Sequence, residues 1–293
     1  MKERMIILIG YDGSECADAA IDDLRRAGLP KKAIAIVVSV VENWLLWSSG
    51  LKLAEGVDEL IQVQATVRRG AARVKKLMPE WEVNSGMGVG SPASAILEKS
   101  EVWNPDLIVV GSHGRTAAGR FFFGSASMKL AHEAHCTVRI ARARREESAS
   151  PLRLIIGVDG SKGSEEAVNL VASCRWPENS EARIVNACWR IPTATSEPML
   201  NRIAGWVAEE HARVKTAIDA AVEKLRQAGL RVSVVMKEEE PKALLLNEAE
   251  GWNADSIFVG ARGLGRVERL LTGSVSSAVA ARAHCSVEIV RVA

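Results

Sequence analysis

Two glycine-rich segments carry the pattern in this chain that is best suited to ligand chemistry. The first reads GSHG at residues 111–114, followed by nine residues and then Gly124-Ser125. The second has the same spacing 149 positions later, with GARG at residues 260–263 and then Gly273-Ser274. Glycine lets backbone N–H groups approach a ligand closely, and a helix N-terminus favours negative charge. Because each segment lies between an apolar, strand-like run and a helix-like stretch, both predict a phosphate cradle.

A second recurring feature is the tripeptide Asp-Gly-Ser, at residues 12–14 and 159–161. Each copy follows an apolar run, where a carboxylate at the end of a strand can accept hydrogen bonds from an amino group or a sugar hydroxyl. The same tripeptide also makes a good turn whose serine caps the next helix, and the residues alone favour neither reading. Ser125 and Ser274 suit a helix cap or a phosphate contact, and the glycines before them favour the phosphate contact.

Charged residues inside the two glycine loops are candidates for neutralising phosphate charge. They are His113, Arg115 and Arg120 in the first loop and Arg262, Arg266 and Arg269 in the second. An arginine in a loop is more often simply solvated, so none of these is assigned a role on its own.

Familiar nucleotide and metal motifs do not occur. Neither loop has the lysine of a P-loop, and Glu268 stands where the dinucleotide fingerprint needs its third glycine. The run HEAH at residues 132–135 is one residue short of the zinc-protease motif. No catalytic residue and no set of metal ligands is predicted.

The elements that must position these residues alternate in type along the chain. Strand-like runs cover residues 6–9, 34–41, 81–87, 107–110 and 137–141, and then 154–158, 182–188, 231–236, 256–259 and 287–290. Helix patterns lie between them, at about residues 15–27, 51–77, 93–102 and 125–134 in the first half, with a long one at 199–227 in the second. This alternation predicts doubly wound parallel sheets covered by helices on both faces, with ligands beyond the carboxyl ends of the strands.

The chain is an internal duplication. The first strand and its Asp-Gly-Ser recur at an offset of 147, and the run AHC at 134–136 recurs at 283–285. We therefore predict two domains, residues 1–144 and 151–293, joined by a linker at about residues 143–150. A chain of 293 residues with 47% hydrophobic and 25% charged residues is long enough for two cores.

Charge and composition limit the partners. The formal net charge is +2, without a block of basic residues, which argues against nucleic acid and acidic membranes. The N-terminal apolar run is too short for a signal peptide or a membrane span, so a cytoplasmic location is expected. The five scattered cysteines form no C-x-x-C pair and are expected to be reduced.

Taken together, these motifs resemble the universal stress protein family. The matching residues are [VI]-x-x-D-G-S, D-x-I-x-V-G, the two glycine frames and A-H-C-[TS]-V, each present in both halves. The resemblance covers essentially the whole chain and indicates the tandem type. It implies a five-stranded parallel sheet in each half, a Rossmann-like fold of the adenine nucleotide alpha hydrolase type, and ATP as ligand, with Mg²⁺ as an option.

By position, the resemblance assigns ligand contacts in both halves. In the first half, Asp12 and the backbone of Val40 are expected to contact adenine and ribose. Asp159 and Ala187 are their counterparts in the second half. Ribose and phosphates fall to Gly111, Gly114, Gly124, Ser125 and Ala126, and to Gly260, Gly263, Gly273, Ser274 and Val275. Two departures stand out, because Ala187 replaces a larger residue and GVGSP at 88–92 becomes EEEP at 238–241.

The resemblance also indicates function and assembly. The first expectation is an ATP-binding module for a stress response or for signalling. The alternatives are a slow ATP hydrolase or self-phosphorylating enzyme, and a scaffold with a vestigial site. The last strands, residues 137–141 and 287–290, are expected to pair within the chain, and a homodimer stays open.

Overall fold

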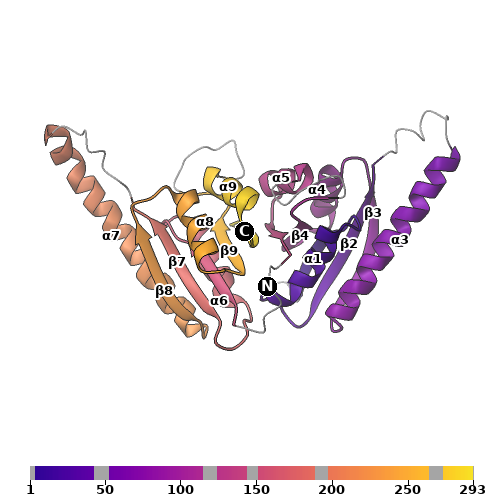
Figure 1. Cartoon of the computed structure of the whole chain (residues 1–293), viewed down its shortest axis with the longest axis horizontal. Helices are drawn as coiled ribbons and strands as arrows, with labels where there is room; N and C mark the ends of the chain where they lie inside the picture. Colours follow the sequence, from indigo (N-terminus) through magenta and orange to yellow (C-terminus); the bar gives the residue numbers. More distant parts are fainter. Residues whose placement is uncertain are drawn as a thin grey trace.

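The computed structural model describes residues 4–42, 53–114, 124–143, 151–188, 197–263 and 273–292. Within these residues, strands and helices alternate, as the sequence predicts, and the strands form one mixed sheet (Figure 1). The order is β3-β2-β1-β4-β5-β10-β9-β6-β7-β8, so the second half mirrors the first. Each half is a parallel, doubly wound sheet whose order reverses beside its first strand.

The first half agrees with the predicted runs to within a few residues. Its elements are β1 (Met5–Gly10), α1 (Glu15–Asp23), β2 (Ala33–Val41), α3 (Leu53–Leu77), β3 (Glu82–Val89), α4 (Pro92–Trp103), β4 (Leu107–Gly111), α5 (Ser125–Glu133) and β5 (Thr137–Ala141). One predicted helix is shorter than expected. The pattern at 15–27 divides into α1 and a 3-10 turn, Leu24–Arg26, and Gly28 follows with a positive φ of 66° that a helix cannot continue.

The second half repeats this series. Its elements are β6 (Arg153–Gly157), α6 (Lys162–Ser173), β7 (Glu181–Ala187), α7 (Glu197–Gln227), β8 (Arg231–Lys237), α8 (Pro241–Gly251), β9 (Ser256–Gly260), α9 (Ser274–Arg282) and β10 (Ser286–Val290). The long helices α3 and α7 lie at the two outer ends of the molecule, and both termini lie near its middle (Figure 1).

Alternate residues of the strands point to opposite faces of the sheet, and each face has its own core. On one face, Leu8 and Ile155 pack with residues of α4, α5, α8 and α9 in a single core that spans both halves. On the other face, Ile7 packs under α1 and α3, and Ile156 packs under α6 and α7, in two separate cores. One hydrophobic core is therefore common to both halves, and each half has a second core of its own.

The two halves meet edge to edge. Strands β5 and β10 pair in antiparallel register, with Arg139 opposite Glu288. Arginines just beyond these strands reach across the join in a reciprocal way. Arg142 donates from Nη2 to the carbonyl of Ala280 in α9 at 2.6 Å, and Arg291 donates to the equivalent Ala131 in α5, also at 2.6 Å.

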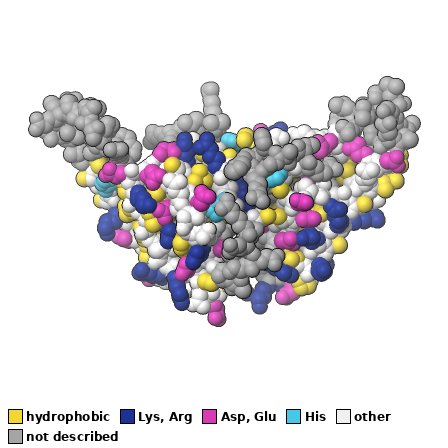
Figure 2. Space-filling model, in the orientation of Figure 1, with side chains coloured by type: hydrophobic (Ala, Val, Ile, Leu, Met, Phe, Trp, Pro, Cys, Tyr) yellow, Lys and Arg dark blue, Asp and Glu magenta, His cyan; other side chains and the backbone are white. Residues whose placement is uncertain are grey.

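The surface is mixed in charge. On the face shown in Figure 2, basic and acidic side chains are interspersed over both halves. This distribution agrees with the net charge of +2. Among the described helices, none combines the length and the apolar character that crossing a bilayer requires.

The core of the second half provides a test of this packing. Phe258 in β9 is fully buried and meets Trp176 edge to face, with 5.9 Å between ring centroids. Replacing Phe258 by alanine is expected to lower the free energy of unfolding by about 3–5 kcal/mol, measured by urea denaturation. The same truncation at Val57, which is exposed, is expected to change it by less than about 0.5 kcal/mol. Equal effects would contradict the assignment of Phe258 to the core.

Candidate functional site

Each half has one cavity at the carboxyl end of its strands, beside the point where strand order reverses. The cavity of the first half has a volume of about 640 Å³, and that of the second about 410 Å³. Both are within the range of small-molecule sites. The residues assigned to the first half all line the first cavity: Asp12, Val40, Gly111, Gly114, Gly124, Ser125 and Ala126. Those assigned to the second half all line the second: Asp159, Ala187, Gly260, Gly263, Gly273, Ser274 and Val275.

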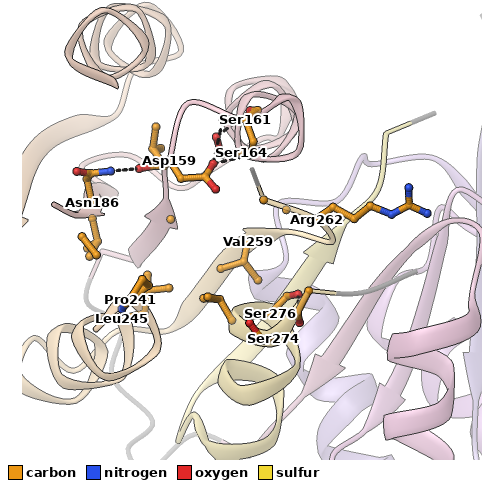
Figure 3. A pocket seen from close by; sticks show the side chains of 18 residues that line it. Asp159, Ser161, Ser164, Asn186, Pro241, Leu245, Val259, Arg262, Ser274 and Ser276 are labelled. Carbon is orange, nitrogen blue, oxygen red and sulfur yellow. Dashed lines mark hydrogen bonds between the residues drawn. The ribbon is translucent and has the colours of Figure 1, made fainter. Parts of the chain in front are cut away.

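The Asp-Gly-Ser tripeptides form tight turns that present a carboxylate to each cavity. Oδ1 of Asp12 accepts from the backbone N–H of Ser14 at 3.0 Å, and Oδ1 of Asp159 accepts from that of Ser161 at the same distance. Both serines also cap the following helix. The turn and the ligand-facing carboxylate are thus compatible, since the serine makes the cap and the aspartate lines the cavity. In the second cavity, Asp159 lies on one side and Ser274 on the other (Figure 3).

Gly114 and Gly263 are needed by the carboxylates themselves. A Cβ atom on Gly114 would lie 2.8 Å from Oδ2 of Asp12, and one on Gly263 would lie 2.6 Å from Oδ2 of Asp159. These distances are shorter than a real Cβ contact, so any side chain would push the carboxylate aside. The glycine loop and the aspartate, far apart in sequence, therefore form one continuous wall in each half.

Gly111 and Gly260 allow the helix that follows the aspartate turn to pack closely against the strand end. A Cβ on Gly111 would lie 2.8 Å from the carbonyl oxygen of Cys16 in α1. A Cβ on Gly260 would lie 2.5 Å from the carbonyl carbon of Gly163 in α6. The absence of a side chain lets the first turn of the helix rest on the strand end, and this contact brings the aspartate turn beside the glycine loop.

The helices α5 and α9 begin at the cavities. Their N-cap residues are Gly124 and Gly273, and neither cap makes a side-chain hydrogen bond to the first turn. Ser125 and Ser274 are therefore the first helical residues, and the reading of them as N-caps is wrong. Both side chains are exposed. The first-turn N–H groups point toward the cavity with the positive end of the helix dipole, an arrangement that suits an anion.

Each aspartate turn is held by a buried polar residue of the neighbouring strand. The sequence patterns did not single out these residues. Ser39, in β2, donates its hydroxyl to the carbonyl of Tyr11 at 2.6 Å. Its counterpart Asn186, in β7, donates to the carbonyl of Val158 at 2.7 Å. A polar residue inside an apolar strand run was the available signal, because such a group needs a partner when it is buried.

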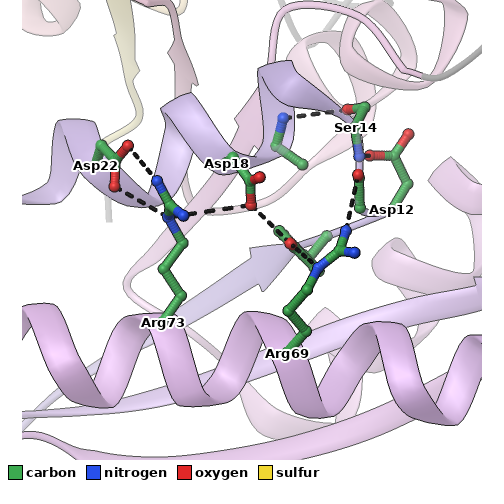
Figure 4. A network of polar contacts seen from close by, with 9 residues as sticks. Asp12, Ser14, Asp18, Asp22, Arg69 and Arg73 are labelled. Carbon is green, nitrogen blue, oxygen red and sulfur yellow. Dashed lines mark hydrogen bonds and ion pairs between the residues drawn. The ribbon is translucent and has the colours of Figure 1, made fainter.

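An arginine from each long outer helix holds the same turn from the side. Arg69, in α3, donates to the carbonyl of Gly13 at 2.9 Å and to the hydroxyl of Tyr11 at 3.0 Å (Figure 4). Tyr11 in turn donates to Asp18 at 2.7 Å, and burial together with this bond raises the pKa of Tyr11. In the second half, Arg213 of α7 donates to the carbonyl of Gly160 at 2.7 Å. A charged residue on an otherwise solvated helix gave no sequence signal.

The two cavities differ in their charged and polar residues. Lys129 and His113 line the first cavity, whereas the second is lined by Arg262 at the position equivalent to His113 and has no counterpart of Lys129, which is replaced by Ala278 outside the lining. Sγ of Cys16 lies 3.1 Å from Nε2 of His113, a pair that the second half replaces by Gly163 and Arg262. Burial raises the pKa of the Cys16 thiol.

The departure before α4 and α8 is local. Ser91 caps α4 with its side chain, whereas Glu240 caps α8 without a side-chain hydrogen bond. Two of the three glutamates of this segment have partners, since Glu240 lies 3.2 Å from Lys242 and Glu239 accepts from the side-chain N–H of Asn247 at 2.9 Å. Arg115, Arg120, Arg266 and Arg269 lie outside the described residues.

Fold and site define a tandem doubly wound α/β protein with one strand-end cavity in each half. The model of the universal stress protein family matches residues 3–142 and again residues 152–291. The chain therefore belongs to the universal stress protein family, with two copies of the family unit in tandem.

Known relatives agree with this assignment. A universal stress protein of Mycolicibacterium smegmatis is 27% identical, and the match covers 97% of this chain and 96% of that protein. One of Thermus aquaticus is 31% identical over 46% of this chain and 97% of its own length. Among solved structures, a universal stress protein from Archaeoglobus fulgidus has a TM-score of 0.66 at 19% identity and covers 98% of this chain and 96% of its own, a likeness of fold.

The close contact at Gly260 can be tested against a glycine with free space around it. Gly260→Ala is expected to lower the free energy of unfolding by about 1–3 kcal/mol, because the new Cβ meets the backbone of Gly163. Gly205→Ala, in α7 with nothing within 4 Å of the new atom, is expected to raise it by about 0.5–1 kcal/mol. Chemical denaturation measures both, and a Gly260→Ala chain as stable as the wild type would contradict the close packing.

Proposed function

We propose that the chain binds one ATP molecule in each cavity and acts as a nucleotide-dependent stress-response or signalling module. The observation that carries this proposal is the gathering of all the assigned residues around two equivalent cavities. Family membership and the tandem arrangement support it.

The residues of each cavity fit a nucleotide from one end to the other. The backbone of Val40 or Ala187 would contact adenine, and Asp12 or Asp159 would accept hydrogen bonds from ribose. The N-terminal amides of α5 or α9 would hold the phosphates, helped by the hydroxyl of Ser125 or Ser274. The absence of a capping side chain at Gly124 and Gly273 fits this role, since the first-turn N–H groups donate no hydrogen bond to a cap side chain. When bound, ATP supplies the negative charge that these groups neutralise.

Nucleotide content provides the first test. We expect freshly purified protein, or protein incubated with ATP and desalted, to release nearly two molecules of intact ATP per chain on extraction. Chromatography of the extract distinguishes ATP, ADP and AMP. Accumulation of ADP with time would instead favour a slow hydrolase. Absence of bound nucleotide, together with no heat of binding by calorimetry, would favour a vestigial site and contradict the proposal.

The carboxylates allow the two sites to be separated. Asp12→Asn is expected to weaken ATP binding in the first site about 10- to 100-fold, because a hydrogen bond to a charged group is lost, while the second site still fills. Asp159→Asn should have the reverse effect, and the double variant should weaken both sites. Calorimetric stoichiometry and affinity measure these outcomes.

Matched controls lie in the first turn of the helix that follows each carboxylate. Glu15 and Glu165 are exposed acidic residues in the first turns of α1 and α6, and neither lines a cavity. Glu15→Gln and Glu165→Gln are expected to leave both affinities within about twofold, since an exposed charge is screened. Unchanged binding in the double aspartate variant would rule out the proposed role of the carboxylates.

A further inference from the structure

A buried ion cluster lies at the join between the halves, away from both cavities. Arg139, in β5, is fully buried and donates to Oδ2 of Asp23 at 2.7 Å and to Oε2 of Glu288 at 2.8 Å. Its third bond, 2.9 Å long, is to the hydroxyl of Ser256. Ser286 donates to the remaining oxygen of Asp23 at 3.0 Å. Asp23 belongs to the first half and the other partners of Arg139 to the second.

The guanidinium of Arg139 depends on these carboxylates. Burial alone would lower the pKa of Arg139, but the charges and hydrogen bonds of Asp23 and Glu288 outweigh this effect and raise it. The arginine therefore stays charged inside the protein. A buried charge is tolerated only with hydrogen-bonded counter-charges, and Arg139 has one in Asp23 of its own half and a second in Glu288 directly across the join.

Arg139 and Glu288 occupy equivalent positions of the two halves, since the ends of the repeat are offset by 149. They also face each other in the antiparallel register, so the symmetry axis between the halves passes through this pair. The flanking pairs join Val138 to Ile289 and Ile140 to Val287. Because both halves have valine and isoleucine at these positions, the flanking pairs would be the same in any combination of halves.

We infer that the Arg139–Glu288 pair makes the strand edge of each half selective for the opposite half. Two first halves would place arginine against arginine, and two second halves would place glutamate against glutamate. Two second halves would bury two carboxylates face to face without the arginine, and two first halves would bury two guanidinium groups face to face, each with only its own Asp23 as counter-charge. Both arrangements are unfavourable relative to the Arg139–Glu288 pair. The apolar residues on both sides stabilise any pairing of the two edges equally, whereas the central charges favour pairing of a first half with a second half.

The other two partners of Arg139, Asp23 and Ser256, also favour pairing between a first half and a second half. The residue equivalent to Asp23 in the second half is Leu170, and the residue equivalent to Ser256 in the first half is Leu107. A pair of first halves would therefore lack the serine hydroxyl as well as the second carboxylate. A pair of second halves would have no cation at all. Any second copy of the chain can join this edge only by exchanging halves, with a first half from one chain and a second half from the other.

Two complementary full-length variants test this inference. Arg139→Glu places glutamate against Glu288, and Glu288→Arg places arginine against Arg139. Each chain alone is expected to melt about 10 °C below the wild type, because a buried pair of like charges replaces an ion pair. When the two variants are co-expressed with different tags, the first half of the Glu288→Arg chain and the second half of the Arg139→Glu chain can form a wild-type join. We expect a 1:1 dimer of the two variants by light scattering, with a melting temperature above that of either alone.

Two controls separate charge selection from general damage. Lys215→Glu alters an exposed ion pair with Asp219 and is expected to shift the melting temperature by less than about 2 °C and to form no mixed dimer. The triple variant Asp23→Asn, Arg139→Met and Glu288→Met removes the whole ion cluster without leaving an unpaired charge or creating like charges, so it should melt above both single variants. A triple variant as unstable as the single ones would assign the loss to missing hydrogen bonds and contradict the inference. Co-expression without a 1:1 complex, whether or not the single variants fold, would overturn it.

Discussion

In each half, a close contact between a helix and a glycine at a strand end places the aspartate turn beside the glycine loop. The first turn of α1 rests on Gly111, and that of α6 rests on Gly260, at distances that leave no room for a Cβ atom. Because the helix is drawn against the neighbouring strand, the turn before it carries Asp12 or Asp159 to the glycine loop. The buried side chains of Ser39 and Asn186 and the arginines Arg69 and Arg213 then fix that turn from two further directions.

The same helices that begin at the cavities end at the join between the halves. α5 starts at Ser125, and its last turn is bonded by Arg291 of the second half, whereas α9 starts at Ser274 and is bonded by Arg142 of the first. Both helices also belong to the one core that spans the sheet. The helix at the edge of each cavity is therefore bonded to the opposite half, although the residues lining each cavity all belong to its own half, and the two halves share one hydrophobic layer.

The sequence predicted the parts of this protein that repeat or alternate. Apolar runs located the strands, and the duplicated glycine frames led to residues that line both cavities. What it did not predict depends on contacts between distant segments. Arg69 reads as a solvated residue of a charged helix, and only the fold places it beside Gly13. In the sequence, Arg139 only interrupts an apolar strand, and the fold shows that it pairs with Asp23 and Glu288. Ser125 suits a helix cap by type, yet Gly124 takes that place, with its own N–H donating to the carbonyl of Ser112.

Duplication within one chain explains how equivalent positions came to hold different residues. In a symmetric dimer of identical units, the residue on the twofold axis faces its own copy, so arginine and glutamate cannot pair there. Once two copies are joined, each can change alone, and the axis can hold an ion pair such as Arg139 with Glu288. The cavities show the same freedom, because His113 and Lys129 line the first, whereas Arg262 lines the second and alanine replaces the lysine. Asp-Gly-Ser and the glycine frame are present in both halves because their geometry leaves little choice, whereas the charges around them differ.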